Sequence, residues 1–112
     1  MTKPTPLEGL RIIDMSAVVM GPFAAQILGD LGADVIKVEP HAGDTTRHVT
    51  PMRHNNMGWV YLHANRNKRS LVLDLKDADG KAAFLKLAEI SDAIITNVRP
   101  AALTRLGLGW DV

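Results

Sequence analysis

The sequence predicts an α/β fold in which a mostly parallel sheet carries helices on its faces. Short β-branched runs alternate with stretches whose apolar residues recur at helical spacing, and this alternation is typical of β-α-β units. Glycine and proline mark the boundaries between the stretches. The chain has 112 residues and 12.2 kDa, which suits one domain, so we expect residues 1–112 to form a single α/β unit.

The first half of the chain predicts one complete β-α-β unit. Residues 10–14 (LRIID) are typical of a buried strand, and Gly21-Pro22 then breaks the chain before a helix over 23–31. Gly32 suits the C-terminal cap of this helix. Residues 34–38 (DVIKV) predict the second strand, and the crossover between these parallel strands should be right-handed.

The second half begins with a polar segment, residues 41–58, that shows neither helical nor strand periodicity. We expect an irregular loop there, and loops of this length are usually functional. Two further strands are predicted at 70–74 and 93–96, separated by a helix over 78–89. A short helix over 101–106 follows Pro100 and completes the pattern.

Composition excludes several classes of function. Thirteen Lys and Arg balance twelve Asp and Glu, which is not the charge excess of a nucleic-acid-binding arm or a polybasic membrane anchor. The absence of cysteine excludes disulfides and thiolate chemistry, and it fits a reducing compartment. The apolar stretch 17–31 is too short and too interrupted to span a bilayer. We therefore expect a cytoplasmic protein with no nucleic-acid or membrane partner.

Ligands of open parallel sheets bind beyond the carboxyl ends of the strands, where four segments of this chain should converge. These segments are residues 16–22, 39–47, 74–76 and 96–100. In the first of them, backbone N–H groups near Gly21 could meet an anionic or carbonyl oxygen, or the loop could simply position a helix. Neither the dinucleotide nor the P-loop glycine pattern occurs in the chain, which disfavours a stand-alone nucleotide-binding domain.

Two polar clusters have both a functional and a structural interpretation. The run Asn65-Arg-Asn-Lys-Arg69 could hold a polyphosphate or form a solvated turn. At the end of the last strand, Asn97 could bind a ligand amide or cap the following turn, and Arg105 could pair with a phosphate.

Candidates for metal binding and acid–base chemistry are weak. The four histidines, at positions 41, 48, 54 and 63, lack the spacing of a helical metal site, so no metal is expected. Asp14, Asp44 and Asp74 are possible carboxylates, but spacing alone places no two of them within acid–base distance.

Taken together, the motifs resemble the N-terminal segment of family III CoA-transferases, the carnitine/bile-acid-inducible type that includes formyl-CoA transferase and α-methylacyl-CoA racemase. The resemblance covers nearly the whole chain in family order. The stretches that carry it are 6–14 (PLEGLRIID), 21–24 (GPFA), 28–40 (LGDLGADVIKVEP), Gly43-Asp44 with Arg47, 65–76 (NRNKRSLVLDLK), 92–100 and 105–109 (RLGLG).

The resemblance implies a Rossmann-like domain that binds coenzyme A in loops at the strand ends. Val19 and Met20 would meet the pantetheine or thioester end of the ligand, mostly through backbone groups. The adenosine and phosphate region would be lined by residues of the later loops, namely Leu73, Asp74, Leu75, Lys76, Asn97, Val98 and Arg99, with Arg105 on a phosphate.

The resemblance also implies that this chain is a fragment of an enzyme whose interlocked homodimer acts on CoA thioesters and carboxylic acids. The catalytic aspartate of the transferases, and the acid–base pair of the racemases, would lie in a later segment, so no catalytic residue is assigned here. A transferase that moves CoA through an enzyme anhydride and thioester is the favoured interpretation. An acyl-CoA racemase segment and a non-catalytic interaction module remain the alternatives.

Overall fold

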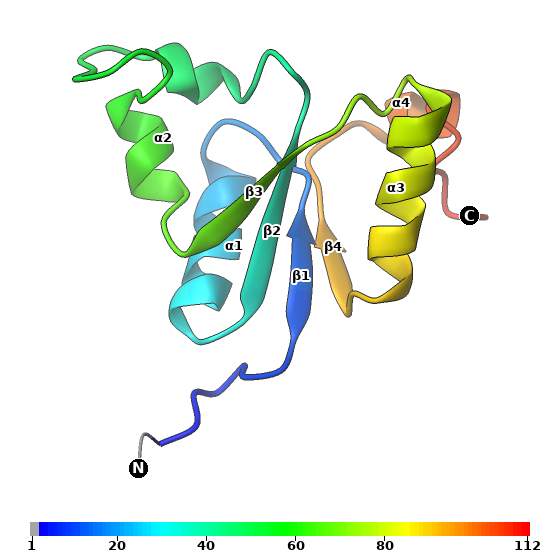
Figure 1. Ribbon diagram of the computed structural model, residues 1–112, viewed down its shortest axis with the longest axis horizontal. Helices are drawn as coiled ribbons and strands as arrows, with labels where there is room; N and C mark the ends of the chain where they lie inside the picture. The colour runs from blue at the N-terminus through cyan, green and yellow to red at the C-terminus, as the bar shows by residue number, and fades with distance from the viewer. Residues whose placement is uncertain (1–2) are drawn as a thin grey trace.

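The computed structural model describes residues 3–112 and confirms the predicted α/β architecture (Figure 1). Four strands form one sheet in the order β3-β2-β1-β4, and each neighbouring pair is parallel. The strands are β1 (Arg11–Asp14), β2 (Asp34–Glu39), β3 (Lys68–Val72) and β4 (Ala93–Ile95). The helices are α1 (Met20–Asp30), α2 (Trp59–Ala64), α3 (Ala78–Glu89) and α4 (Pro100–Arg105), with a 3-10 turn η1 (Thr45–His48).

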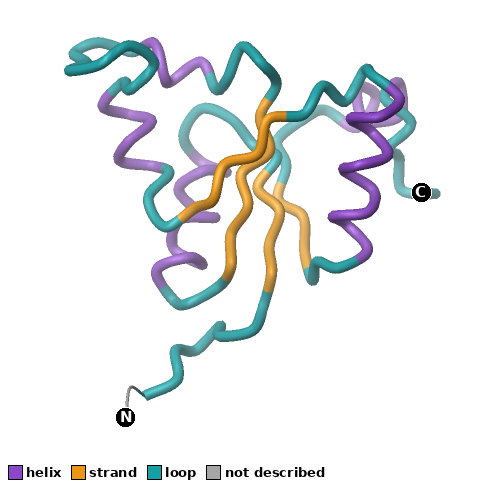
Figure 2. Tube along the Cα trace, viewed as in Figure 1, coloured by secondary structure: helices purple, strands orange, loops and turns teal. Residues whose placement is uncertain are grey.

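Side-chain alternation along the strands divides the core between the two faces of the sheet. Ile12 packs on one face and its neighbour Ile13 packs on the other, because successive strand residues point in opposite directions. On the face of α1, the buried cluster is Ile12, Ala25, Ala33 and Val35. On the face of α3, it is Ile13, Val38 and Phe84. Figure 2 shows the sheet between these two layers of helices.

The topology creates a switch point between β1 and β4. The chain runs from β1 through β2 to β3 at one edge, and α3 then returns it to β4 on the other side of β1. The loops after β1 and β4 therefore leave the sheet in opposite directions and open a crevice at its carboxyl edge. This edge lies at the top of Figure 1, away from the N-terminal segment.

The structure corrects the predicted polar loop and the third strand. Within residues 41–58, η1 forms a turn, and α2 begins directly after this segment, where we predicted no helix. With six residues, α2 is too short for apolar periodicity to identify it. Strand β3 covers Lys68–Val72 instead of 70–74, because its cationic first residues find carboxylates and do not form a turn.

The remaining elements match the predictions within a few residues. Helix α3 has the predicted bounds, and α1 begins at Met20, so that Pro22 lies in its first turn. Helix α4 begins at Pro100, one residue earlier than predicted. No helix within residues 3–112 is long and apolar enough to cross a membrane.

Candidate functional site

A cleft of about 310 Å³ lies at the carboxyl edge of the sheet, at the switch point between β1 and β4. Segments that follow all four strands contribute to its walls. They are Met15–Ala17 after β1, the end of β2 with Pro40 and Gly43–Thr45, Leu73–Lys76 after β3, and Asn97 and Val98 after β4, together with Leu106 beyond α4. The strand ends thus converge as the sequence predicts.

Six of the ten predicted coenzyme A residues line this cleft, namely Leu73, Asp74, Leu75, Lys76, Asn97 and Val98. The other four lie outside its lining. Val19 and Met20 are exposed at the start of α1, where Met20 as a residue is 80% exposed. Arg99 and Arg105 are exposed at the two ends of α4. All ten assignments remain predictions of ligand contact.

Asn97 has a role that neither sequence interpretation anticipated. Its carboxamide forms two hydrogen bonds with the backbone of Ala17: the Ala17 N–H donates to Oδ1 (3.1 Å), and Nδ2 donates to the Ala17 carbonyl (2.8 Å). An asparagine side chain can match a peptide group in this way because it carries both a donor and an acceptor. Asn97 therefore joins the loops on the two sides of the switch point.

Beside the cleft, two lysines and two aspartates form a buried charged cluster on the α1 face of the sheet. Lys68 Nζ contacts Asp14 Oδ2 at 2.7 Å, and Lys37 Nζ contacts Asp44 Oδ2 at 3.1 Å and Asp14 Oδ2 at 3.9 Å. All four side chains are at most 2% exposed. Each buried charge thus has an opposite charge beside it, which offsets the cost of desolvation.

Two members of this cluster, Asp44 and Lys68, have pKa values shifted by their surroundings. Burial acts to raise the pKa of Asp44, but hydrogen bonds from Thr46 and Lys37 outweigh it and hold that pKa below its ordinary value. Burial lowers the pKa of the Lys68 ammonium, and the nearby Asp14 carboxylate offsets only part of this effect. Because Asp14 and Asp44 are buried and paired with lysines, they are structural carboxylates rather than exposed acid–base groups.

A second polar group, formed by Glu39, Arg47 and Tyr61, adjoins the cluster, because the Asp44 N–H donates to Glu39 Oε2. Arg47 donates to both Glu39 carboxylate oxygens, at 2.9 and 2.6 Å, and its guanidinium carbon lies 3.8 Å from the centre of the Tyr61 ring. Burial acts to raise the pKa of Glu39, but hydrogen bonds from Arg47 and from the Asp44 N–H, with the charges of Arg47 and Lys37, outweigh it and lower that pKa. Burial and the Glu39 charge together raise the pKa of Tyr61 to about 12.

The basic run 65–69 contains an exposed turn at Arg66 and Asn67, and its three cations pair with carboxylates of the same chain. Lys68 is buried on Asp14, as described above. Arg66 pairs with Asp30 at 2.7 Å, and Arg69 pairs with Asp34 at 2.6 Å. All three cations of the run are thus occupied by carboxylates of the same chain, a pairing that spacing along the sequence could not reveal.

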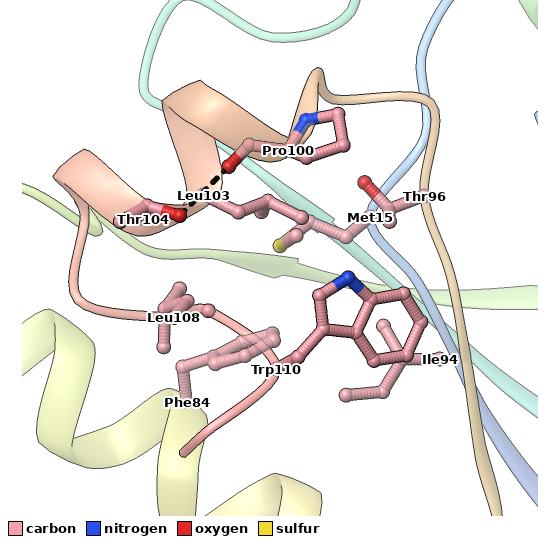
Figure 3. A pocket seen from close by; sticks show the side chains of 10 residues that line it. Met15, Phe84, Ile94, Thr96, Pro100, Leu103, Thr104, Leu108 and Trp110 are labelled. Carbon is pink, nitrogen blue, oxygen red and sulfur yellow. Dashed lines mark hydrogen bonds between the residues drawn. The ribbon is translucent and has the colours of Figure 1, made fainter.

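A smaller, apolar cavity of about 220 Å³ lies between α3, β4, α4 and the last residues of the chain (Figure 3). Phe84 and Leu108 line one side, and the Trp110 ring lies near Ile94. Met15 contributes to the lining of both cavities, so the two hollows adjoin along the end of β1.

Sequence reasoning missed the parts of the site that depend on long-range contacts. The predicted converging segment 16–22 includes Ser16 and Ala17, which line the cleft, whereas Met15, which also lines it, lies outside that segment. The position of Met15 directly after a buried strand was the available signal. For metals, the part of the chain that the structure describes brings no three His, Asp or Glu side chains together as ligands.

Comparison with protein families matches residues 7–112 to the model of CoA-transferase family III. A succinyl-CoA:glutarate CoA-transferase of Mus musculus is 47% identical over 107 residues, which are 95% of this chain and 24% of that protein. The beta subunit of a succinyl-CoA–L-malate CoA-transferase of Chloroflexus aurantiacus is 45% identical, over 99% of this chain and 28% of the relative. The chain spans about a quarter of the length of these relatives.

Solved structures agree with the sequence comparison. A CAIB/BAIF family protein of Brucella suis superposes with a TM-score of 0.88 at 35% identity, over 97% of this chain and 30% of that one. A hypothetical protein of Mycobacterium tuberculosis superposes with a TM-score of 0.86 at 40% identity, over 96% and 29% of the two chains. The predicted resemblance and the predicted fold are both confirmed.

Proposed function

The chain belongs to CoA-transferase family III, and from that membership we propose that it forms the CoA-binding N-terminal part of an acyl-CoA:carboxylate CoA-transferase. The observation that carries the proposal is the cleft at the switch point. Its lining combines apolar side chains, such as Leu73 and Leu75, with one exposed cation, Lys76. Apolar walls with a few polar groups are typical of sites for small ligands.

Coenzyme A would fit the distribution of charge around this cleft. The molecule combines an uncharged pantetheine arm with an adenosine end that carries several phosphate charges. Within residues 3–112, Lys76, Arg99 and Arg105 form no salt bridge, whereas Lys37, Arg47 and Lys68 are paired with carboxylates. In the proposal, the apolar wall receives the pantetheine arm, and the three cations without a salt bridge receive the phosphates.

The names of the relatives support transfer of CoA between carboxylic acids. One relative is named for succinyl-CoA and glutarate, and another for succinyl-CoA and malate. We assign this chain to the same class of substrates, CoA thioesters and small carboxylic acids. Asp14 and Asp44 are buried in ion pairs, so neither is free to attack a thioester. In the proposal, the nucleophile lies in a later segment of the full-length protein, as the family resemblance implies.

The interlocked homodimer also belongs to this proposal. The segment would supply the CoA-binding floor, and the remaining three quarters of a full-length relative would supply the nucleophile and the subunit interface.

Titration calorimetry of the 112-residue chain with coenzyme A tests the proposal. We expect saturable binding that weakens about three- to tenfold in Lys76→Ala, because a charge-assisted hydrogen bond to phosphate is lost. Dephospho-CoA and ATP, titrated in parallel, show which phosphates contribute. Binding should also weaken with added salt where the contacts are exposed.

Lys86→Ala is the matched control, because Lys86 is an exposed lysine on α3 outside the lining of the cleft. Equal affinity of the Lys76→Ala and Lys86→Ala chains would remove Lys76 from the site. No binding by a chain that circular dichroism shows to be folded would contradict a CoA site within this segment.

A further inference from the structure

Val18 lies in the loop between β1 and α1 with a φ of 73°, in the left-handed region. A β-branched residue is strained there, and such a conformation persists only where the surroundings determine it. The determining contact is a carboxylate. The two oxygens of Asp44 lie 3.3 and 3.2 Å from the Val18 nitrogen and accept its N–H, although Asp44 follows 26 residues later in the chain.

Asp44 is itself held rigidly. Its carboxylate accepts from Lys37 Nζ at 3.1 Å and from the N–H and hydroxyl of Thr46 at 2.9 and 2.7 Å. Its own N–H donates to Glu39 Oε2 at 2.7 Å. Because Asp44 is only 3% exposed, no water competes freely for these positions, and the carboxylate presents a fixed acceptor to the loop.

The two residues before Val18 are held by other parts of the chain. Lys37 donates to the Ser16 carbonyl at 3.0 Å, and Asn97 forms its two hydrogen bonds with Ala17. Ser16, Ala17 and Asp44 all line the cleft, and hydrogen bonds through Val18 and Lys37 link Asp44 to the two loop residues. Three consecutive loop residues are therefore held by hydrogen bonds from other parts of the chain. The bond to Asp44 is the one that stabilises the strained backbone, at Val18.

We propose that Asp44 is a positioning residue: it holds Val18 in the left-handed conformation, and through Val18 it sets how Ser16 and Ala17 line the cleft. The consequence for ligand binding rests on the proposed CoA-binding function. The effect of Asp44 on the loop conformation is independent of that function and can be measured without a ligand.

Amide hydrogen exchange of the 112-residue chain, followed by NMR, measures the effect on the loop. In Asp44→Asn, the exchange rate of the Val18 N–H should rise about tenfold relative to that of Ile13 in the core strand, because the charged acceptor is lost. Asp34→Asn is the matched control. Asp34 is likewise a carboxylate that accepts hydrogen bonds from cationic side chains, here two arginines, but it lies at the amino end of β2. The ratio of the Val18 to the Ile13 exchange rate should therefore stay unchanged in this variant.

An unprotected Val18 N–H in the unsubstituted chain would overturn the proposal, and so would equal ratios in the two variants. A second variant covers the case in which Asp44→Asn does not fold. Val18→Gly removes the strain because glycine adopts positive φ freely, so the urea midpoint of the otherwise unchanged chain should rise. A lower midpoint would show that Val18 is not strained and would also overturn the proposal.

Coenzyme A titration separates this inference from the proposed function. We expect Asp44→Asn to weaken CoA binding about tenfold and Asp34→Asn to leave it unchanged. Equal affinity in both variants would overturn the positioning role in binding, while the function of the cleft would stand. If the unsubstituted chain binds no CoA and the exchange result holds, the proposed function fails for this segment and the control of the loop by Asp44 stands.

Discussion

Lys68 supports the buried end of β1 through four contacts. Its Nζ carries three N–H groups and lies within hydrogen-bond distance of four acceptors: Asp14 Oδ2 at 2.7 Å, the carbonyls of Pro22 and Ala64 at 2.8 and 3.0 Å, and Asn65 Oδ1 at 2.8 Å. The Lys68 side chain is 2% exposed. A buried ammonium with this many acceptors joins β3, β1, α1 and α2 at one point, so its removal leaves several polar groups without a partner.

Lys68→Met should therefore be strongly destabilising. The substitution keeps most of the side-chain volume but leaves the Asp14 carboxylate buried with only the more distant Lys37 beside it, a defect that costs about 3–5 kcal/mol. Urea unfolding followed by circular dichroism measures the loss. Arg66→Met is the control, because Arg66 lies in the same basic run but its side chain is 62% exposed, and its urea midpoint should not change. Similar midpoints for the two variants would show that the Lys68 contacts contribute little.

At the scale of elements, α2 depends on a close backbone approach. Gly58 caps the start of this helix, and its N–H donates to the Arg47 carbonyl at 2.8 Å. A Cβ at position 58 would meet the carbonyls of Val49 and Arg47 at 2.7 and 2.9 Å, and the Thr46 carbonyl still closer. Only glycine lets η1 and α2 pack at this distance.

Gly58→Ala should consequently destabilise the domain by about 1–3 kcal/mol, since backbone carbonyls cannot move aside as side chains do. Thermal unfolding measures the effect. Gly109→Ala is the control, because the nearest atom to its added Cβ is the end of the flexible Asp111 side chain, and its unfolding temperature should stay within a degree or so. A Gly58→Ala chain as stable as the control would show that η1 and α2 can separate without cost.

For the whole molecule, buried carboxylates make stability depend on acid pH. The pKa values of Asp44 and Glu39 are lowered below their ordinary values of 3.8 and 4.5, so the native state binds fewer protons than the unfolded state in this range. Their contribution is complete above pH 4.5 and is lost as the pH falls through the native pKa values.

The expected result is a urea midpoint that is constant from neutral pH down to about pH 5 and falls steeply below it. Glu39→Gln should make this acid-dependent fall shallower, because the substituted amide does not titrate. Unfolding curves recorded at a series of pH values test this. A fall of equal steepness in the variant and in the unsubstituted chain would assign the acid sensitivity to other carboxylates.

The elements that the sequence predicted well are those with strong local signals. Helix α3 has twelve residues and the predicted bounds, and the buried strands β1 and β2 differ from prediction by one residue at one end. The missed element, α2, has six residues, and its position depends on Gly58 and η1 instead of on its own periodicity. Local patterns therefore predicted the elements that bury their own apolar face.

The sequence by itself determined the α/β class, the parallel sheet and, through its motifs, the family, because periodicity and motif order are properties of the chain alone. Only the tertiary structure decided the roles of the charged residues. Lys68 became a buried partner of Asp14, and Asp44 became the acceptor for Val18. These pairs lie 54 and 26 residues apart, and pairing at such separations follows from how the strands assemble, which no local pattern encodes.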